Sequence, residues 1–260
     1  MKCILTIVFL TLTLWGNDSL LSQNIGELKN TIENSQGKER AKAQLELASV
    51  LISTDPLKSI EYAQKAEKFG IESDAEMIEG NARLVKGHAF FQLKEYNKSF
   101  EQTLKAIEIF EFLDKDSYSS SFELLGEIDF ILEKYSSSAS YFEKVFDYLK
   151  KSNKKKQAAY VSSKIGKCFE EQEKYLLAVE WYSTSYDFYS EVKDFRSMVR
   201  MQSNLGGVFS NYGDYHKAER FTLNALDLAK KHSINAEIDK LEQRLKIIKK
   251  NKESDKYNTT

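Results

Sequence analysis

Turn-forming residues and cysteine are scarce in this sequence. Its 260 residues include 1 proline and 11 glycines. An all-β sandwich or barrel needs a turn signal about every 8–12 residues, so this composition excludes that class. Two cysteines cannot build a disulfide framework.

An excess of charge of one sign is also lacking. The chain carries 38 Lys and Arg residues against 39 Asp and Glu residues, a net charge of −1. We therefore expect no nucleic-acid partner, because the chain has no basic footprint for phosphate groups. With 42% hydrophobic and 30% charged residues, it is too apolar for a disordered chain and too charged for a membrane bundle.

A long apolar run occurs once, at the N-terminus. Met1 and Lys2 precede residues 3–15, all of which are apolar or Thr, and a polar group follows at residues 16–19. This order is typical of a secretory signal peptide, which we predict at residues 1–22 with cleavage after Ser19 or Ser22. The protein is then exported, periplasmic or extracellular, without a membrane span after cleavage. A membrane anchor is the alternative, but 13 helical residues span only about 20 Å of a hydrocarbon core of about 30 Å.

Three sets of residues recur at intervals of 39, 40 and 40 residues. The first set, the glycine column, is Gly87, Gly126, Gly166 and Gly206. The second is Tyr96, Tyr135, Tyr175 and Tyr215, and the third is Ser99, Ser138, Ala178 and Ala218. With a degenerate first copy, the period predicts five repeats over residues 39–234.

Apolar residues within each copy have helical spacing. In the fifth copy, Met201, Leu205 and Val208 lie on one helical stripe, and residues 211–214 interrupt it. Asp214 is placed to cap the helix that follows. Each copy is therefore predicted to form one antiparallel helix pair.

The glycine column calls for a physical cause, since glycine inside a helix costs about 1 kcal/mol relative to alanine. Each column member precedes a member of the small-residue set by 12 residues. Two helix axes that approach closely need small side chains at their crossing, so we expect the column to mark close contacts within each pair. Leucine should be destabilising there, whereas we expect alanine to cost little.

The pattern Leu205-Gly206-x-x-Phe209, followed by Gly213-Asp214-Tyr215-x-x-Ala218, resembles the tetratricopeptide repeat (TPR). The resemblance covers about residues 39–234, although the common TPR period is about 34 residues. The third copy departs from the pattern with Asp129 where an aromatic residue is usual, and the first lacks the glycine and the tyrosine. The resemblance implies an all-α, right-handed solenoid of five helix pairs with a C-terminal capping helix. Similar long-period arrays occur in exported bacterial proteins and in the sensor regions of bacterial signalling kinases.

The flanking segments fit such an array. Residues 23–38 are predicted to form a leading helix. Residues 235–250 carry a narrow apolar stripe that is typical of a capping helix. The polar residues 251–260 are expected to form a flexible tail.

Residues with catalytic or metal-binding potential do not group in the sequence. The three histidines fall in different registers, and no Cys-x-x-Cys or His-x-x-x-His spacing occurs. Cys168 lies on the apolar side of its helix, which favours a core thiol. We therefore expect no metal, no cofactor and no enzymatic activity; an enzyme with an unrecognised site is an alternative.

The TPR resemblance implies that the first helix of each pair lines a groove for a protein or peptide partner. The candidate groove residues are Asn81, His88, Phe91, Glu127, Phe130, Tyr160, Lys167 and Arg200. The TPR clamp for chaperone C-terminal carboxylates uses Lys and Asn in its second and third rows. Here the second row is Leu45, Leu84, Glu123, Ser163 and Ser203, and the third has no Asn, which disfavours that ligand class. The other alternative is a detached or truncated sensor region of a signalling kinase. The sequence identifies neither the partner nor the oligomeric state.

Overall fold

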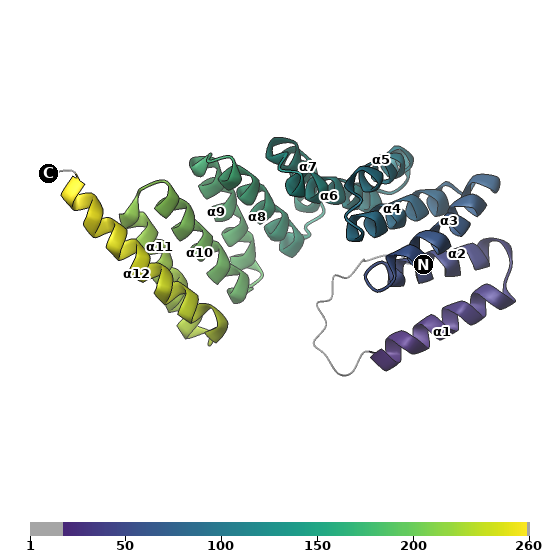
Figure 1. Cartoon of the computed structure of the whole chain (residues 1–260), viewed down its shortest axis with the longest axis horizontal. Helices are drawn as coiled ribbons and strands as arrows, with labels where there is room; N and C mark the ends of the chain where they lie inside the picture. The colour runs from purple at the N-terminus through teal and green to yellow at the C-terminus, as the bar shows by residue number, and fades with distance from the viewer. Residues whose placement is uncertain (1–17, 259–260) are drawn as a thin grey trace. The chain divides into compact units, whose positions relative to one another are not determined.

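The computed structural model describes the backbone of residues 18–258 and the side chains of residues 23–254. All secondary-structure elements in this range are α-helices (Figure 1). They are α1 (Asp18–Asn34), α2 (Gly37–Leu51), α3 (Pro56–Glu72), α4 (Glu76–Gln92), α5 (Tyr96–Leu113), α6 (Lys115–Ile131), α7 (Tyr135–Lys151), α8 (Lys155–Glu171), α9 (Tyr175–Glu191), α10 (Phe195–Asn211), α11 (Tyr215–Lys231) and α12 (Asn235–Asn258). The predicted signal peptide lies outside the described side chains.

The chain divides into two compact units within α6. The N-terminal unit extends to Ile128, and the C-terminal unit begins at Asp129. In the N-terminal unit α1 to α5 pack in consecutive order along the chain, and α2 also packs on α4. In the C-terminal unit α7 to α12 pack in the same consecutive order (Figure 1). The predicted pairs α2–α3, α4–α5, α8–α9 and α10–α11 are therefore present. By their order along the chain, α2, α4, α6, α8 and α10 are the first helices of the predicted repeats and α3, α5, α7, α9 and α11 are the second helices.

The period follows from regular helix and turn lengths. From α7 to α11 each helix has the same length and is followed by a three-residue turn, so one pair with its turns reproduces the repeat interval of the glycine column. The connection from α5 to α6 is the single residue Asp114, in extended conformation, and that copy is one residue shorter.

Most turns contain one residue in the left-handed conformation. These residues have φ between 53° and 60° and are Asp74, Lys94, Glu133, Asn153, Glu173, Lys193 and Ser233; Gly213 is the glycine counterpart at φ 88°. A side chain makes this conformation costly, so the turn needs other stabilisation. In the α8–α9 turn, the amide of Lys174 donates to Phe169 O (2.9 Å) and thereby satisfies a carbonyl at the end of α8.

Aspartate side chains begin three of the helices. Asp55, Asp194 and Asp214 each accept a hydrogen bond from the backbone amide three residues later. The predicted cap at Asp214 is confirmed, with 2.9 Å from the Lys217 amide to Asp214 Oδ1. That hydrogen bond stabilises the carboxylate and lowers the pKa of Asp214.

The glycine column marks close contacts, as predicted, but the closest neighbour differs from the expected one. A Cβ atom at Gly166 would lie 2.9 Å from Tyr182 Cδ1, and one at Gly206 would overlap Thr222 Oγ1. Tyr182 and Thr222 lie one helical turn beyond the small residues that were predicted as direct neighbours of these glycines. Gly206 therefore has no room even for a methyl group, which contradicts the expectation that alanine costs little.

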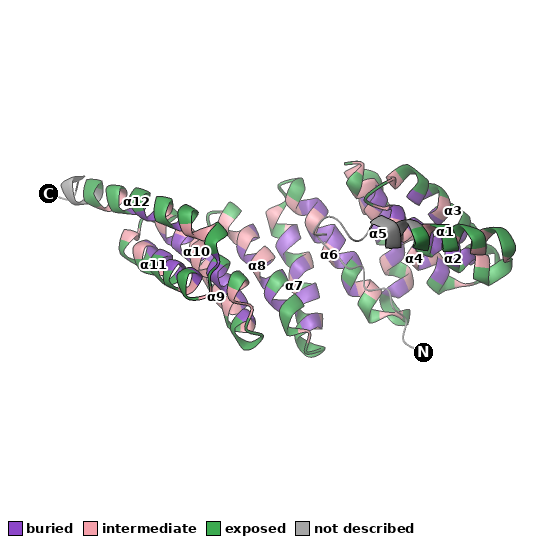
Figure 2. Ribbon diagram, turned by 90° about the horizontal axis from the view of Figure 1, so that it is seen from below, coloured by how far each residue is buried: buried purple, intermediate pink, exposed green. Residues whose placement is uncertain are grey.

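The two terminal helices have unequal contacts. None of the described side chains of α1 is fully buried, although Ile25, Leu28 and Ile32 are partly buried. In α12, Leu241, Leu245 and Ile248 are buried, while exposed residues cover the outer face (Figure 2). This helix continues to Asn258, beyond residue 250 where we expected the capping helix to end.

Helix α12 has the position of a first helix in a sixth pair. It begins one repeat interval after α10, and its buried stripe repeats that of α10 at the same interval. Two exposed lysines, Lys246 and Lys249, occupy the positions that are Gly206 and Phe209 in α10.

Within residues 18–258, no helix combines the length and apolar content that a membrane span requires.

Candidate binding surfaces

The predicted groove residues are distributed over four first helices and both units. Asn81, His88 and Phe91 lie on α4, and Glu127 lies on the part of α6 that belongs to the N-terminal unit. The C-terminal unit holds the rest: Phe130 on α6, Tyr160 and Lys167 on α8, and Arg200 on α10. The structure therefore assigns them to two separate sets.

On α4 the candidate residues are engaged in local contacts. Asn81 Nδ2 donates to Met77 O (2.7 Å), and Phe91 packs edge-to-face on Tyr96 with 5.8 Å between ring centres. Nε2 of His88 is buried without a hydrogen-bond partner. Burial lowers the pKa of His88 to about 4, because the desolvated imidazolium is disfavoured.

The assignment of second-row residues on α2 and α4 to the groove surface is wrong. Leu45 and Leu84 are buried, with 6% and 4% of their surface exposed. The physical reason is that α2 and α4 pack directly on one another, which encloses side chains at this register.

In the C-terminal unit, α8 and α10 present a more accessible set. Tyr160 is 41% exposed, and Lys164 Nζ lies 5.3 Å from the centre of its ring. Arg200 is exposed and forms no ion pair among the described residues. Lys167 is tied to its own helix by Glu170 (3.2 Å) and Glu171 (2.8 Å). Phe130 packs edge-to-face on Tyr135, with 5.3 Å between ring centres.

Arg244 on α12 extends this face, and sequence reasoning missed it. Its Nη1 donates to Ser203 Oγ at 2.8 Å and to Ser203 O on α10. The guanidinium also lies against Gly207 on α10, with Nη1 3.6 Å from where a Cβ atom would stand. The sequence contains a pattern that could have identified Arg244, because the apolar stripe of α12 repeats that of α10 after one repeat interval.

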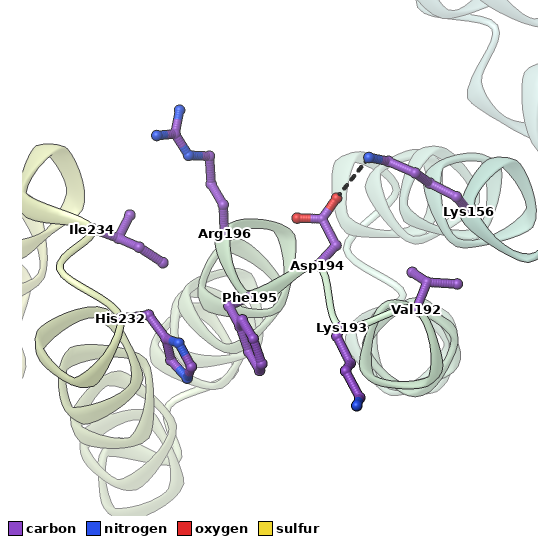
Figure 3. Close-up of a pocket in the computed structure, with 8 residues that line it drawn as sticks. All are labelled: Lys156, Val192, Lys193, Asp194, Phe195, Arg196, His232 and Ile234. Carbon is purple, nitrogen blue, oxygen red and sulfur yellow. Dashed lines mark ion pairs between the residues drawn. The ribbon is translucent and has the colours of Figure 1, made fainter.

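A pocket of about 440 Å³ lies at the α9–α10 and α11–α12 turns (Figure 3). Its aromatic part is a stack of Phe195 on His232, with ring centres 3.6 Å apart. Lys156 pairs with Asp194 at 3.2 Å, and Asp194 also caps α10. Figure 3 shows Lys193 and Arg196 pointing to different sides of the pocket. The positive charges therefore do not converge on one anion position.

Comparison with known proteins identifies the fold. No protein-family model matches the sequence, and no curated protein matches it. Among solved structures, a STAND protein with a tetratricopeptide repeat sensor from Pyrococcus horikoshii matches with a TM-score of 0.72 at 15% identity, over 81% of this chain and 33% of that one. RapI in its apo form matches with a TM-score of 0.62 at 14% identity, over 91% of this chain and 92% of that one. A Rap protein complexed with competence and sporulation factor matches with a TM-score of 0.60 at 15% identity, over 89% and 71%.

The fold is TPR-like. At these identities the similarity shows the fold alone. The chain spans about a third of the STAND protein.

One TPR-like position in the third pair has unusual chemistry. Asp129 stands where α4, α8 and α10 carry Phe90, Phe169 and Phe209, and it is buried. Its Oδ2 accepts a hydrogen bond from Ser137 Oγ, whereas Oδ1 has no hydrogen-bond partner and only a long ion-pair contact with Lys134 Nζ (3.9 Å). A half-satisfied buried carboxylate costs stability relative to the aromatic residue.

Potentially reactive side chains in the TPR-like pairs have structural contacts. Cys168 is buried, as predicted for a core thiol, and its Sγ lies 3.3 Å from Ser138 Oγ. Tyr182 OH donates to Glu170 Oε2 at 2.8 Å, and burial together with this carboxylate raises the pKa of Tyr182. Within the described residues, no group of three or more His, Cys, Asp or Glu side chains is arranged to hold a metal ion.

Proposed function

We propose that this protein is a TPR-like scaffold that binds a segment of a partner protein on the first-helix face of α8, α10 and α12. The observation that carries the proposal is the exposure of Tyr160 and Arg200 without a buried structural role. Arg244 supports it, because its contacts with Ser203 hold α12 against α10 and lengthen the face.

The chemistry of this face favours a segment with acidic and apolar side chains. Tyr160 supplies an exposed aromatic surface, Lys164 supplies positive charge beside it, and Arg200 supplies positive charge on α10. Aromatic residues and arginine are the side chains that most often dominate protein interfaces. A Rap protein with a similar fold is complexed with competence and sporulation factor, and it supports a binding role for this chain by analogy alone.

Site-specific photocrosslinking in the native host tests the proposal. A photoreactive amino acid at Tyr160 should capture a partner protein, and Arg200→Glu should abolish that capture by reversing a charge of the proposed binding face. The matched control is the same photoreactive group at Tyr212, which is 53% exposed in the α10–α11 turn. Equal capture at both positions, or capture at Tyr160 that persists with Arg200→Glu, would refute the assignment of this face.

We further propose that the protein is exported, on the basis of the N-terminal sequence pattern. N-terminal sequencing of secreted or periplasmic material should find a chain that begins at Leu20 or Gln23. An intact Met1 in a membrane fraction would indicate an anchor instead. The sensor-region alternative stays a prediction, and the downstream reading frame tests it.

A further inference from the structure

Helix α5 carries the most exposed large apolar side chain in the part of the chain that the structure describes. Phe112, in the last turn of α5, is 87% exposed. The equivalent positions in α7, α9 and α11 hold the exposed charged residues Lys151, Glu191 and Lys231. The repeat therefore needs no apolar residue at this position, and the fold gives Phe112 no role in the core.

Phe112 is part of a mixed apolar and acidic surface that we call the α5 stripe. Four exposed residues at helical spacing on one side of α5 form it: Leu104, Glu108, Glu111 and Phe112. Leu113, which follows Phe112, is exposed as well. Apolar side chains that are grouped on a surface, unlike single ones, are typical of interaction sites.

The α5 stripe has a net negative charge. On the same side of α5, Lys105 pairs with Glu101 at 2.6 Å, so these two charges compensate one another. At the end of the helix, the positive charge of Lys115 follows directly after the negative charge of Asp114. The two glutamates of the stripe are left as its net charge.

The first-helix face of α8, α10 and α12 has the complementary character. It combines the exposed ring of Tyr160 with the positive charges of Arg200 and Arg244. Lys240 adds another exposed cation, because it occupies the position of Arg200 one repeat interval later, on α12. The two carboxylates at the end of α8 are already paired with Lys167. The face is therefore aromatic and basic, whereas the α5 stripe is aromatic and acidic.

We propose that the partner of this face is a second copy of the chain, which docks through its α5 stripe. This inference rests on the proposed function, because it assigns a partner to the same face. Phe112 of one copy packs against Tyr160 of the other, and the glutamates of the stripe meet the cations of α10 and α12. The stripe is held in shape by the buried side of α5, which includes Ala106 and Phe110, so no segment has to fold before it binds.

The proposed contact joins two different surfaces. The α5 stripe lies in the N-terminal unit of one copy, and the basic face lies in the C-terminal unit of the next. Such a heterologous contact leaves one surface of each kind open at the ends of a dimer. Association is therefore expected to continue beyond the dimer, into rings or chains.

Sedimentation velocity of the purified full chain over a concentration series tests the proposal. The sedimentation coefficient should rise with concentration, and about 1 M salt should weaken the association because it screens the charges. Phe112→Ser and Arg200→Glu should each weaken association about tenfold or more. The matched control is Leu57→Ser, because Leu57 is also an exposed apolar residue, at 67%, but lies on α3 outside the stripe.

A mixture of the two variants supplies a sharper test. The Phe112→Ser chain retains its basic face, and the Arg200→Glu chain retains its α5 stripe. An equimolar mixture should therefore form a 1:1 dimer that cannot grow further, although each variant alone stays monomeric. A photoreactive amino acid at Tyr160 of the purified chain should form a crosslink to residues 104–112 of a second copy, identified by mass spectrometry.

Three results would overturn the proposal: a monomer at every concentration, equal effects of Phe112→Ser and Leu57→Ser, or no association in the mixture. Association through the apolar residues 3–15 would give equal effects, because all variants retain them. Photocrosslinking in the host separates this failure from that of the proposed function. Capture of a different protein at Tyr160 would refute self-association alone, whereas no capture at all would refute both.

Discussion

Two adjacent glycines on α10 should respond in opposite directions to substitution by alanine. A Cβ atom at Gly206 would overlap Thr222 Oγ1 and lie 3.3 Å from Ala218 O. Thr222 is completely buried and donates to Ala218 O (2.8 Å), so it cannot move aside without losing that hydrogen bond. A Cβ atom at Gly207 would meet nothing nearer than Arg244, at 3.6 Å.

The magnitudes follow from these contacts. Alanine in place of a helical glycine gains about 1 kcal/mol at either position. At Gly206 this gain is opposed by overpacking of about 1–3 kcal/mol and by about 1 kcal/mol for the disturbed Thr222 hydrogen bond. Gly206→Ala should therefore lower the free energy of unfolding by about 1–3 kcal/mol, whereas Gly207→Ala should raise it by up to about 1 kcal/mol.

Urea denaturation followed by circular dichroism measures both changes, and hydrogen exchange of α10 and α11 locates them. A double-mutant cycle with Thr222→Ala tests whether this contact is the cause, because the alanine removes the overlapping oxygen. In that background Gly206→Ala should be at least about 1 kcal/mol less harmful. If both glycine variants stabilise the protein equally, the close-contact explanation of the glycine column is incorrect.

Three further predictions concern turns and titratable groups. Glu173→Gly should raise the free energy of unfolding by up to about 1 kcal/mol in urea denaturation, because Glu173 has φ 57°, whereas Lys174→Gly, at φ −82°, should not. Asp214→Ala should lower the free energy of unfolding by about 1 kcal/mol near pH 7. The lowered pKa of Asp214 stabilises the fold above the ordinary carboxyl pKa, and that contribution is lost as the pH falls. The difference between the variant and the parent protein should therefore vanish in acid. In a pH series of proton NMR spectra, the imidazole of His88 in the folded protein should titrate near pH 4. Between about pH 6.5 and about pH 4 only the unfolded chain takes up this proton, so the free energy of unfolding should decrease as the pH falls through this range. His88→Gln should weaken this pH dependence.

The repeat architecture could be read from the sequence because helix pairs leave strong periodic signals. The intervals of the glycine column and Asp214 as a cap predicted the helices and one helix start correctly. The contact partner of Gly206 was misplaced by one helical turn, since the register of two packed helices depends on side-chain shape that spacing does not reveal. The left-handed conformation of most turn residues could not be predicted from the sequence either, because positions such as Glu173 are held in place by backbone hydrogen bonds and carry no glycine.

The functional surfaces were predicted less completely, for a different physical reason. Exposure of a first-helix residue depends on how closely the neighbouring first helix packs, and Leu84 is buried on α4, which packs on α2. The pocket that contains Phe195 and His232 brings together α8, α10 and two turns without any local motif.

The two lysines on the outer face of α12 have a consequence for building longer arrays from this chain. A second helix joined after α12 would have to bury Lys246 and Lys249 in order to pack as the other repeats do, and buried unpaired charges are strongly disfavoured. Modular extension at this end would therefore require Lys246→Gly and Lys249→Phe before any new repeat is appended. With those changes α12 would acquire the same docking chemistry as α10, and a copy of α11 would become a compatible module.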